Sequence, residues 1–466
     1  MKKPMRMVAL SVSLVALSAC ASLSTDADIQ QAAQASLPSL PDQWLVDGAT
    51  PGEVQIGWID RIVDPLLSEL VREAQINNRD IQAAAANVEA SRALARQARS
   101  ALFPSVDANF NADRTGRFKG PIPDVSQYTL TLQAQWEADL WGRVRSGSQA
   151  AYASTQAVEA DFRFAQYALA QAVAASYFAC LEAQLQIGVA EETVAALAEI
   201  DRIVRVRYRE GFASSQDTAI AASDLASASD SLENARGGAR LARRSLEVLL
   251  GRYPGDQIEL KTGLPITPDT PAAGIPSNLL ERRPDIIAAE RRVAAAFASL
   301  DQSKAARLPL VTLTGNLGGA SNDLTDILNG PNLIWSIIGN VLQPIFDGGL
   351  RDAAVDEADA NQRVAISSYA SAALNALQEV ENGLDQTQVL RKRQQILQDA
   401  ADKSTTAYRL TELQYKEGET DLIDVLNIQQ RLFAAQRDLV SVKRQRIDQW
   451  MALNLALGGD WQPTEE

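Results

Sequence analysis

The sequence predicts a mainly α-helical chain made of two equivalent halves, each interrupted by a β-hairpin long enough to cross a membrane. Three observations lead to this prediction: an internal duplication, stretches in which apolar and polar side chains alternate, and two long windows without proline. The duplication organises the rest of the chain, because a repeat that preserves its internal lengths is a property of the fold.

The duplication relates residues 79–106 to residues 284–311 at a constant offset of 205, with 11 identities among the 27 positions that start at Asp80. In each copy a helical pattern ends at a proline and an alternating stretch follows. Proline ends a helix and favours extended geometry in the residue before it. A YxEG segment also occurs twice, as YREG and then YKEG. We therefore expect two structurally equivalent halves of one domain.

The first predicted hairpin covers residues 105–141, and its second strand alternates strictly from Tyr128 to Glu137. About ten residues is the length of a tilted strand that crosses a bilayer. Apolar side chains toward lipid and polar side chains toward the lumen are typical of an outer-membrane barrel. An amphipathic hairpin in a soluble sandwich is the alternative. The predicted lumen-facing side chains are Thr129, Thr131, Gln133, Gln135 and Glu137.

A second, less regular hairpin is expected over residues 310–343. Each hairpin is followed by a proline-free window that predicts two helices joined at the YxEG segment. The first helix of each pair has about 65 residues, or roughly 100 Å at 1.5 Å per residue. Apolar residues at steps of three and four, with alanines between them, indicate closely packed helices. Gly211 and Gly418 predict the turns that join the two helices of each pair, since glycine accepts the left-handed conformation that ends a helix.

The amino terminus has a basic start, an apolar segment and small residues before Cys20, which together predict a secretory signal. Leu17-Ser18-Ala19-Cys20 is similar to a bacterial lipobox, so we expect cleavage before Cys20 and lipidation of its thiol, with palmitate among the acyl chains. An ordinary signal with an incidental cysteine is the alternative. The residue after Cys20 is Ala21. An aspartate at that position would resemble an inner-membrane retention signal, so its absence favours sorting to the outer membrane. Two or three acyl chains hold a protein at a membrane stably.

These features predict the organisation of the whole chain. A break in the first helical stretch is expected at Asn77-Asn78. The predicted parts are a signal peptide over 1–19, a lipidated, extended arm over 20–64, a first repeat over 65–253, a proline-rich crossover linker over 254–284, a second repeat over 285–461 and a tail over 462–466.

The composition excludes several classes of function. The chain has no histidine, so Ser-His-Asp and Cys-His catalysis and histidine-ligated metals are excluded. Its two cysteines lie far apart, and Cys180 is predicted to be a buried, inert thiol. A net charge of −14 argues against nucleic acid as a partner. We expect no enzymatic activity, no cofactor and no metal site.

Two hairpins supply four strands, which are too few to close a barrel. An open sheet in lipid leaves backbone groups without hydrogen-bond partners, at a cost of several kcal/mol each. Protomers are therefore expected to share a barrel, for which about eight strands is the minimum. The residues by themselves do not fix the number of protomers.

The segment from Leu279 to Gly318 resembles the second-repeat signature of the TolC-like outer membrane efflux factors. The ending ALNLALGGDW and the lipobox resemble the lipoprotein branch of that family, which serves resistance-nodulation-division pumps. The resemblance covers essentially the whole mature chain. It implies a homotrimer with a twelve-stranded barrel in the outer membrane of a Gram-negative bacterium, continued by a long α-helical barrel through the periplasm. It also implies passive export of drugs or other small solutes, with a periplasmic adaptor and an inner-membrane pump as partners.

The resemblance further implies a gate at the periplasmic tip. Tyr415 matches the gate tyrosine, and Asp217 matches the carboxylate that it meets on a neighbouring protomer. Asp424 matches one acid of a ring that narrows the pore, and Asp421 lies on the same turn. The chain departs from the pattern at Thr420, where some members have an arginine, and at Asn427, where some have a second ring acid.

The acidic residues at the tip also have a purely structural interpretation. Ser214 and Asp421 can be helix N-caps, with Asp217 and Asp424 favouring the first turns of their helices. This interpretation is sufficient for the local sequence and does not exclude a gate.

Two other functions remain open from the sequence. A lipid-anchored coiled-coil spacer explains the long helices and Cys20 but not the alternating hairpins. A protein-secretion duct of the same fold has the same sequence features as a duct for small solutes.

Overall fold

The computed structural model describes residues 24–46, 52–54, 57–62, 64–116, 118, 124–261 and 263–459. They form two compact units. The first draws on Met1–Pro38, Ala86–Ala160 and Ile287–Ala372, and the second on Ser39–Ala85, Asp161–Ile286 and Ala373–Glu466.

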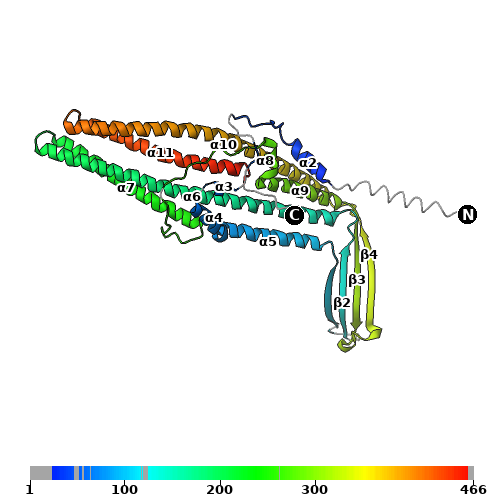
Figure 1. Ribbon diagram of the computed structural model, residues 1–466. Helices are drawn as coiled ribbons and strands as arrows, with labels where there is room; N and C mark the ends of the chain where they lie inside the picture. The colour runs from blue at the N-terminus through cyan, green and yellow to red at the C-terminus, as the bar shows by residue number, and fades with distance from the viewer. Residues whose placement is uncertain are drawn as a thin grey trace. The chain divides into compact units, whose positions relative to one another are not determined.

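The first unit contains a four-stranded sheet in which the strands lie in chain order and every neighbouring pair is antiparallel (Figure 1). Both predicted hairpins are confirmed, and they pair with each other through β2 and β3. β1 and β4 form the two edges of this sheet. The strands are β1 (Ser105–Thr115), β2 (Val125–Glu137), β3 (Leu310–Ser321) and β4 (Leu333–Leu342).

The helices confirm the two-fold repeat. α6 has 67 residues and α10 has 68, close to the length that the proline-free windows predict. The expected break in the first stretch is present, because α4 ends at Asn77 and α5 begins at Arg79. The bounds are α4 (Pro65–Asn77), α5 (Arg79–Ser100), α6 (Arg143–Arg209), α7 (Ser215–Leu249), α9 (Pro284–Ala305), α10 (Leu350–Glu417) and α11 (Leu422–Ala456).

The prediction of an extended arm over residues 20–64 is wrong where the structure describes helices. α2 (Asp26–Ala35) and α3 (Trp58–Arg61) both lie in that stretch. α2 forms because the Thr25 hydroxyl accepts from the Asp28 backbone N–H while the Asp28 carboxylate accepts from the Thr25 backbone N–H, which is a capping box. Cys20 lies outside the described residues. The crossover linker likewise contains a short helix, α8 (Pro276–Arg282).

The second unit has an apolar core in which the arm packs against the helices. Trp58 of α3 and Trp450 of α11 are both 1% exposed, with their rings edge to face at 6.5 Å between centroids. Arg61 places its guanidinium 5.3 Å from the Trp450 ring centroid, in a cation–π contact. The Tyr177 hydroxyl of α6 donates to the Asp64 carboxylate at 2.8 Å. The end of the arm, from Trp58 to Asp64, is therefore packed into the core of the second unit.

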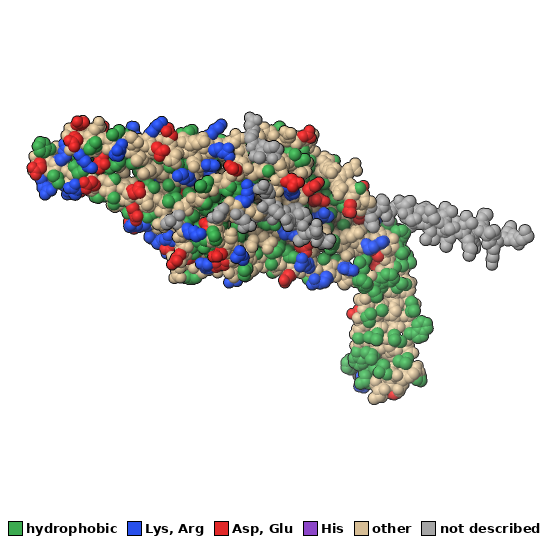
Figure 2. Space-filling model, in the orientation of Figure 1, with side chains coloured by type: hydrophobic (Ala, Val, Ile, Leu, Met, Phe, Trp, Pro, Cys, Tyr) green, Lys and Arg blue, Asp and Glu red, His purple; other side chains and the backbone are tan. Residues whose placement is uncertain are grey.

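Surface chemistry differs between the sheet and the helices. Figure 2 shows hydrophobic side chains gathered over the sheet, whereas Lys, Arg, Asp and Glu are spread over the helices. Trp335, Ile337 and Val341 of β4 are 75%, 77% and 67% exposed in the single chain. Among the described residues, α6 is the one helix with a window apolar enough to cross a membrane, and 44% of that window is buried.

Candidate functional site

The strand register divides the sheet into two faces of different polarity. Side chains directly opposite each other on neighbouring strands share a face. Gln133 of β2 lies opposite Asp107 of β1 and Asn316 of β3, which makes one face polar.

The other face is apolar in the same register. Leu132 of β2 lies opposite Ala108 of β1 and Leu317 of β3. The alternation seen in one strand of the sequence therefore extends over β1, β2 and β3. In β4 it is less regular, because Ile334 and Ile338 lie opposite Gly318 and Thr314 on the polar face. The sequence-predicted lumen residues Thr129, Thr131, Gln133, Gln135 and Glu137 all lie on the polar face.

The two tip turns have the same backbone geometry in both halves. Gly211 and Gly418 have φ angles of +82° and +85°, which confirms the left-handed conformation that their positions predict. After α6, the N–H of Phe212 donates to the carbonyl of Arg207 at 2.8 Å. After α10, the N–H of Glu419 donates to the carbonyl of Gln414, also at 2.8 Å. Each long helix thus ends in a Schellman motif, and the chain reverses into α7 or α11.

The start of α7 is a complete capping box. The Ser214 hydroxyl accepts from the Asp217 backbone N–H at 3.1 Å, and the Asp217 carboxylate accepts from the Ser214 backbone N–H at 2.8 Å. These bonds, first the backbone one and then one from the Ser214 hydroxyl, lower the pKa of Asp217. The predicted caps are therefore confirmed here, and Asp217 is a half-buried, ionised carboxylate at the tip.

The start of α11 is built differently. Asp421 occupies the N-cap position, but its side chain makes no capping hydrogen bond, so its predicted capping bond is wrong. Instead the Thr420 hydroxyl donates to the Asp424 carboxylate at 2.9 Å. Asp421 and Asp424 are both exposed. The residue that departs from the family pattern, Thr420, is thus the partner of the predicted ring acid.

Tyr415 lies in the core of the tip rather than on its surface. The residue is 4% exposed and packs in a cluster with Leu197, Val204 and Leu426, among others. Burial raises the pKa of its phenol, Arg207 opposes that shift, and the charge of Asp217 adds to it. The phenol is therefore protonated at neutral pH and is available as a hydrogen-bond donor.

Arg207 connects the two halves at the tip, and the sequence analysis missed it. Its guanidinium carbon lies 4.8 Å from the Tyr415 ring centroid, and one Nη donates to the Tyr415 carbonyl at 2.8 Å. Its charge also lowers the pKa of Asp217. The sequence carried one signal: Arg207 precedes the YREG segment, whereas the equivalent Gln414 precedes YKEG.

The structure thus brings Tyr415, Arg207 and Asp217 together within one chain, while no described contact joins Asp424 to them. The arrangement holds no group of three metal-ligating acids or cysteines within the described residues. Cys180 is buried, and burial raises the pKa of its thiol to about 11, as expected of an inert cysteine. The candidate site therefore consists of the polar face of the sheet and the hydrogen-bonded turns at the tip.

A duplicated helical chain with a two-faced membrane sheet is the architecture of an outer-membrane exit channel, and comparison with known proteins agrees. Residues 70–252 and 275–459 match the outer membrane efflux protein family. The chain belongs to this family, which is the TolC-like group that its motifs resemble. Members of this family are channel proteins of the outer membrane, and this chain is an exit duct of an efflux system.

Three relatives show how widely the likeness extends. The toluene efflux pump outer membrane protein TtgF of Pseudomonas putida is 32% identical over 88% of this chain and 86% of its own length. The cation efflux system protein CusC of Escherichia coli is 29% identical over 91% of this chain and 92% of its own. The open-state structure of the MtrE outer membrane channel of Neisseria gonorrhoeae superposes with a TM-score of 0.83 at 29% identity, covering 91% of this chain and 97% of MtrE.

Proposed function

We propose that three copies of the chain form one exit channel, to whose barrel each contributes its four-stranded sheet. The observation that carries this proposal is the sheet itself, which has a polar and an apolar face along β1, β2 and β3 and two edges without a partner strand in the single chain. A membrane leaves no water to satisfy an edge, so β1 of one protomer must pair with β4 of the next. Three protomers give twelve strands, which is above the size at which side chains fill a barrel.

The lining of this barrel follows from the register. The polar face, with Thr129, Thr131, Gln133, Gln135 and Glu137 among its members, faces the lumen. Glu137 lies at the end of β2 and accepts from the Arg143 guanidinium, so its charge is neutralised beside the start of α6. The wall is thus polar but largely uncharged along β2, which suits solutes of differing charge.

The tip closes the resting channel. Tyr415 keeps its phenol proton, and Asp217 is an ionised acceptor with one oxygen committed to the Ser214 cap. A small rotation of the helix pairs lets Tyr415 of one protomer donate to Asp217 of its neighbour, a bond to a charged group worth about 1.5–3 kcal/mol. Gly211 and Gly418 form the turns that carry these groups, and Asp424, with Asp421 beside it, forms the acidic ring.

Lipid on Cys20 anchors the chain to the inner leaflet of the outer membrane. The backbone N–H and the hydroxyl of Ser24 donate to the Asp301 carboxylate of α9, at 2.6 and 3.1 Å. The chain is thus fixed to the first unit at Ser24, four positions after the proposed lipid site.

The partners of the channel are a periplasmic adaptor and an inner-membrane pump of the resistance-nodulation-division type. The relatives bear names of pumps for toluene and of a system for cations, so similar channels export unlike solutes. Specificity then belongs to the pump, and the channel passes what the pump delivers. No catalytic step is assigned to the chain.

Native mass spectrometry of the detergent-solubilised protein tests the shared barrel. The expected result is a species with the mass of three chains that survives mild activation. Dissociation of the sample into single folded chains across all detergents would contradict the proposal, since a lone sheet has no partner for its edges.

A further inference from the structure

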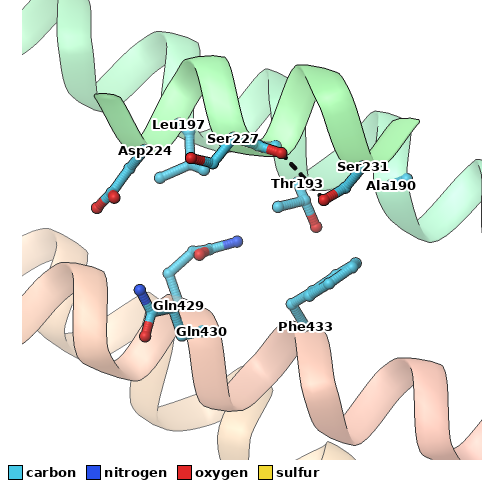
Figure 3. Close-up of a pocket in the computed structure, with 10 residues that line it drawn as sticks. Ala190, Thr193, Leu197, Asp224, Ser227, Ser231, Gln429, Gln430 and Phe433 are labelled. Carbon is cyan, nitrogen blue, oxygen red and sulfur yellow. Dashed lines mark hydrogen bonds between the residues drawn. The ribbon is translucent and has the colours of Figure 1, made fainter. Parts of the chain in front are cut away.

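A cavity of about 190 Å³ lies between α6, α7 and α11 in the second unit (Figure 3). In Figure 3 the side chains of Gln429 and Phe433 extend from α11 toward the other two helices. The residues that line the cavity are Ala190, Thr193 and Leu197 of α6, Asp224, Ser227, Ala228 and Ser231 of α7, and Gln429, Gln430 and Phe433 of α11.

The cavity is a gap between two apolar clusters of the helix packing. Leu197 belongs to the cluster that contains Tyr415, and Ala190 belongs to the next cluster, with Leu232 and Ala239. Close-packed protein interiors have few voids larger than a water molecule. The small side chains that α6 and α7 present here keep the helices from closing the space. A gap of this size can hold water or a small ligand.

The hydroxyls around the cavity are committed as donors. Thr193 donates to the Val189 carbonyl at 2.8 Å. Ser227 donates to the Ser223 carbonyl, and Ser231 donates to the Ser227 carbonyl, both at 3.0 Å. A hydroxyl that donates its proton still offers its oxygen lone pairs. The cavity wall therefore presents three hydroxyl acceptors rather than donors.

Asp224 and Gln429, which are the more buried of the unpaired polar side chains that line the cavity, have no partner among the described residues. Asp224 is half-buried and makes no ion pair or hydrogen bond within the described part of the chain. Gln429 is 5% exposed, and its amide is likewise without a described hydrogen bond. The amide of Gln429 is therefore free to form hydrogen bonds with a molecule in the cavity. The lining contains no Lys or Arg, which leaves the charge of Asp224 uncompensated.

The aromatic wall offers a surface against which a second ring can pack. Phe433 is partly buried, and the Arg437 guanidinium, which is not part of the lining, already lies 5.7 Å from its ring centroid. A phenyl ring attracts a cation over its face and packs against another ring at its edge. The cavity thus combines one negative charge, several acceptors and an aromatic surface.

We propose that this cavity binds a small organic ammonium ion that carries one ring. The ammonium group donates to the Asp224 carboxylate and to the neighbouring hydroxyl oxygens, while the ring packs between Phe433 and Leu197. The size agrees, because an engineered cavity of about 150 Å³ in another protein binds benzene. The site goes beyond conduction through the lumen, since it lies inside the helix packing of a single chain.

Ligand-observed NMR titration of the full-length protein in detergent tests this site, with benzylammonium as the ligand. Benzyl alcohol and benzoate have the same ring with a neutral or a negative group. Benzylammonium is expected to bind at least tenfold more tightly than benzyl alcohol, and benzoate is expected not to bind. Equal affinity for benzylammonium and benzyl alcohol would overturn the proposal, because the carboxylate would then have no part in recognition.

Two matched variants of α7 complete the test. Asp224→Asn is close to isosteric and should weaken benzylammonium binding at least tenfold while leaving benzyl alcohol unchanged. Asp230→Asn removes an exposed charge on the same helix outside the cavity and should bind like the unaltered protein. If Asp224→Asn binds benzylammonium as tightly as Asp230→Asn does, the cavity is a packing gap filled by water only.

Discussion

Replacing Leu132 by arginine tests the orientation of the sheet in the membrane. Leu132 lies near the middle of the 13-residue strand β2 and shares the apolar face with Ala108 and Leu317. An arginine that faces lipid at the midplane costs about 2–4 kcal/mol. In a trimer the cost is repeated three times, about 6–12 kcal/mol, comparable with the whole stability of a folded domain.

The matched control is one residue away. Gln133→Arg introduces the same group on the polar face, opposite Asp107 of β1 and Asn316 of β3, where it meets water and a carboxylate. Leu132→Met controls for the change of shape, since it keeps the site apolar at a similar volume. Semi-native gel electrophoresis of outer-membrane fractions measures the share of chains in heat-sensitive trimers.

The expected result is at least a tenfold loss of trimer for Leu132→Arg, with Gln133→Arg and Leu132→Met close to the unaltered protein. The two arginine variants differ only in the face on which they lie. If both assemble equally well, or if Gln133→Arg is the more damaging, then the faces have been assigned wrongly.

Other predictions concern the anchor, the tip and the helical core. Radiolabelled palmitate should be incorporated into the unaltered protein and not into Cys20→Ser. Equal labelling of the two proteins would contradict lipidation of Cys20. In single-channel recordings in planar bilayers, Tyr415→Phe and Asp217→Ala should raise the open probability, and Asp424→Ala should reduce the preference for cations. If all three variants conduct like the unaltered channel, the gate lies elsewhere. Burial raises the pKa of Asp448 to about 6 from an ordinary value of 3.8. Because the folded state then binds the proton more tightly, the free energy of unfolding should fall as pH rises from about 4 to about 6. The free energy of unfolding of Asp448→Asn, measured by urea titration, should lack this part of the pH dependence. A pH profile like that of the unaltered protein would contradict the raised pKa of Asp448.

Much of the architecture could be predicted from local pattern. The hairpins were predictable because a strand with one lipid face and one water face must alternate in polarity. The ends of α6 and α10 were predictable because Gly211 and Gly418 supply a conformation that other residues rarely adopt. The length of the two long helices follows from the absence of proline over the same windows.

Other features depended on signals that hydrophobic pattern does not carry. α2 has a single buried residue, Ala33, so it lacks the apolar stripe that marks a helix, and its signal was the Thr25–Asp28 capping box. α3 has only four residues and is held by the burial of Trp58. Composition and prolines suggested an extended arm because neither reports capping or tertiary burial.

The candidate site could be predicted only in part, because burial and contacts between the two halves have no signal in the local sequence. Tyr415 and Asp217 were found by resemblance, but the burial of the tyrosine ring was not. Arg207 reaches Tyr415 across 208 positions of sequence, so its contact exists only once the two halves have packed. Asp421 makes no capping bond and Thr420 bonds Asp424, and neither side-chain arrangement has a signal in the local sequence.

Cross-linking of the two sheet edges tests the central claim most directly. Ala108→Cys in β1 is combined in turn with a cysteine at each apolar-face position of β4, because neighbouring strands place opposite Cα atoms about 4.5–5.5 Å apart, within reach of a disulfide. The control pair Val106→Cys and Ala134→Cys joins register partners within one chain and should leave the mass of a single chain. The account predicts that at least one β1–β4 pair gives a covalent three-chain product on non-reducing gels. A scan in which no pair links chains, or in which linking stops at two, would contradict a barrel shared by three protomers.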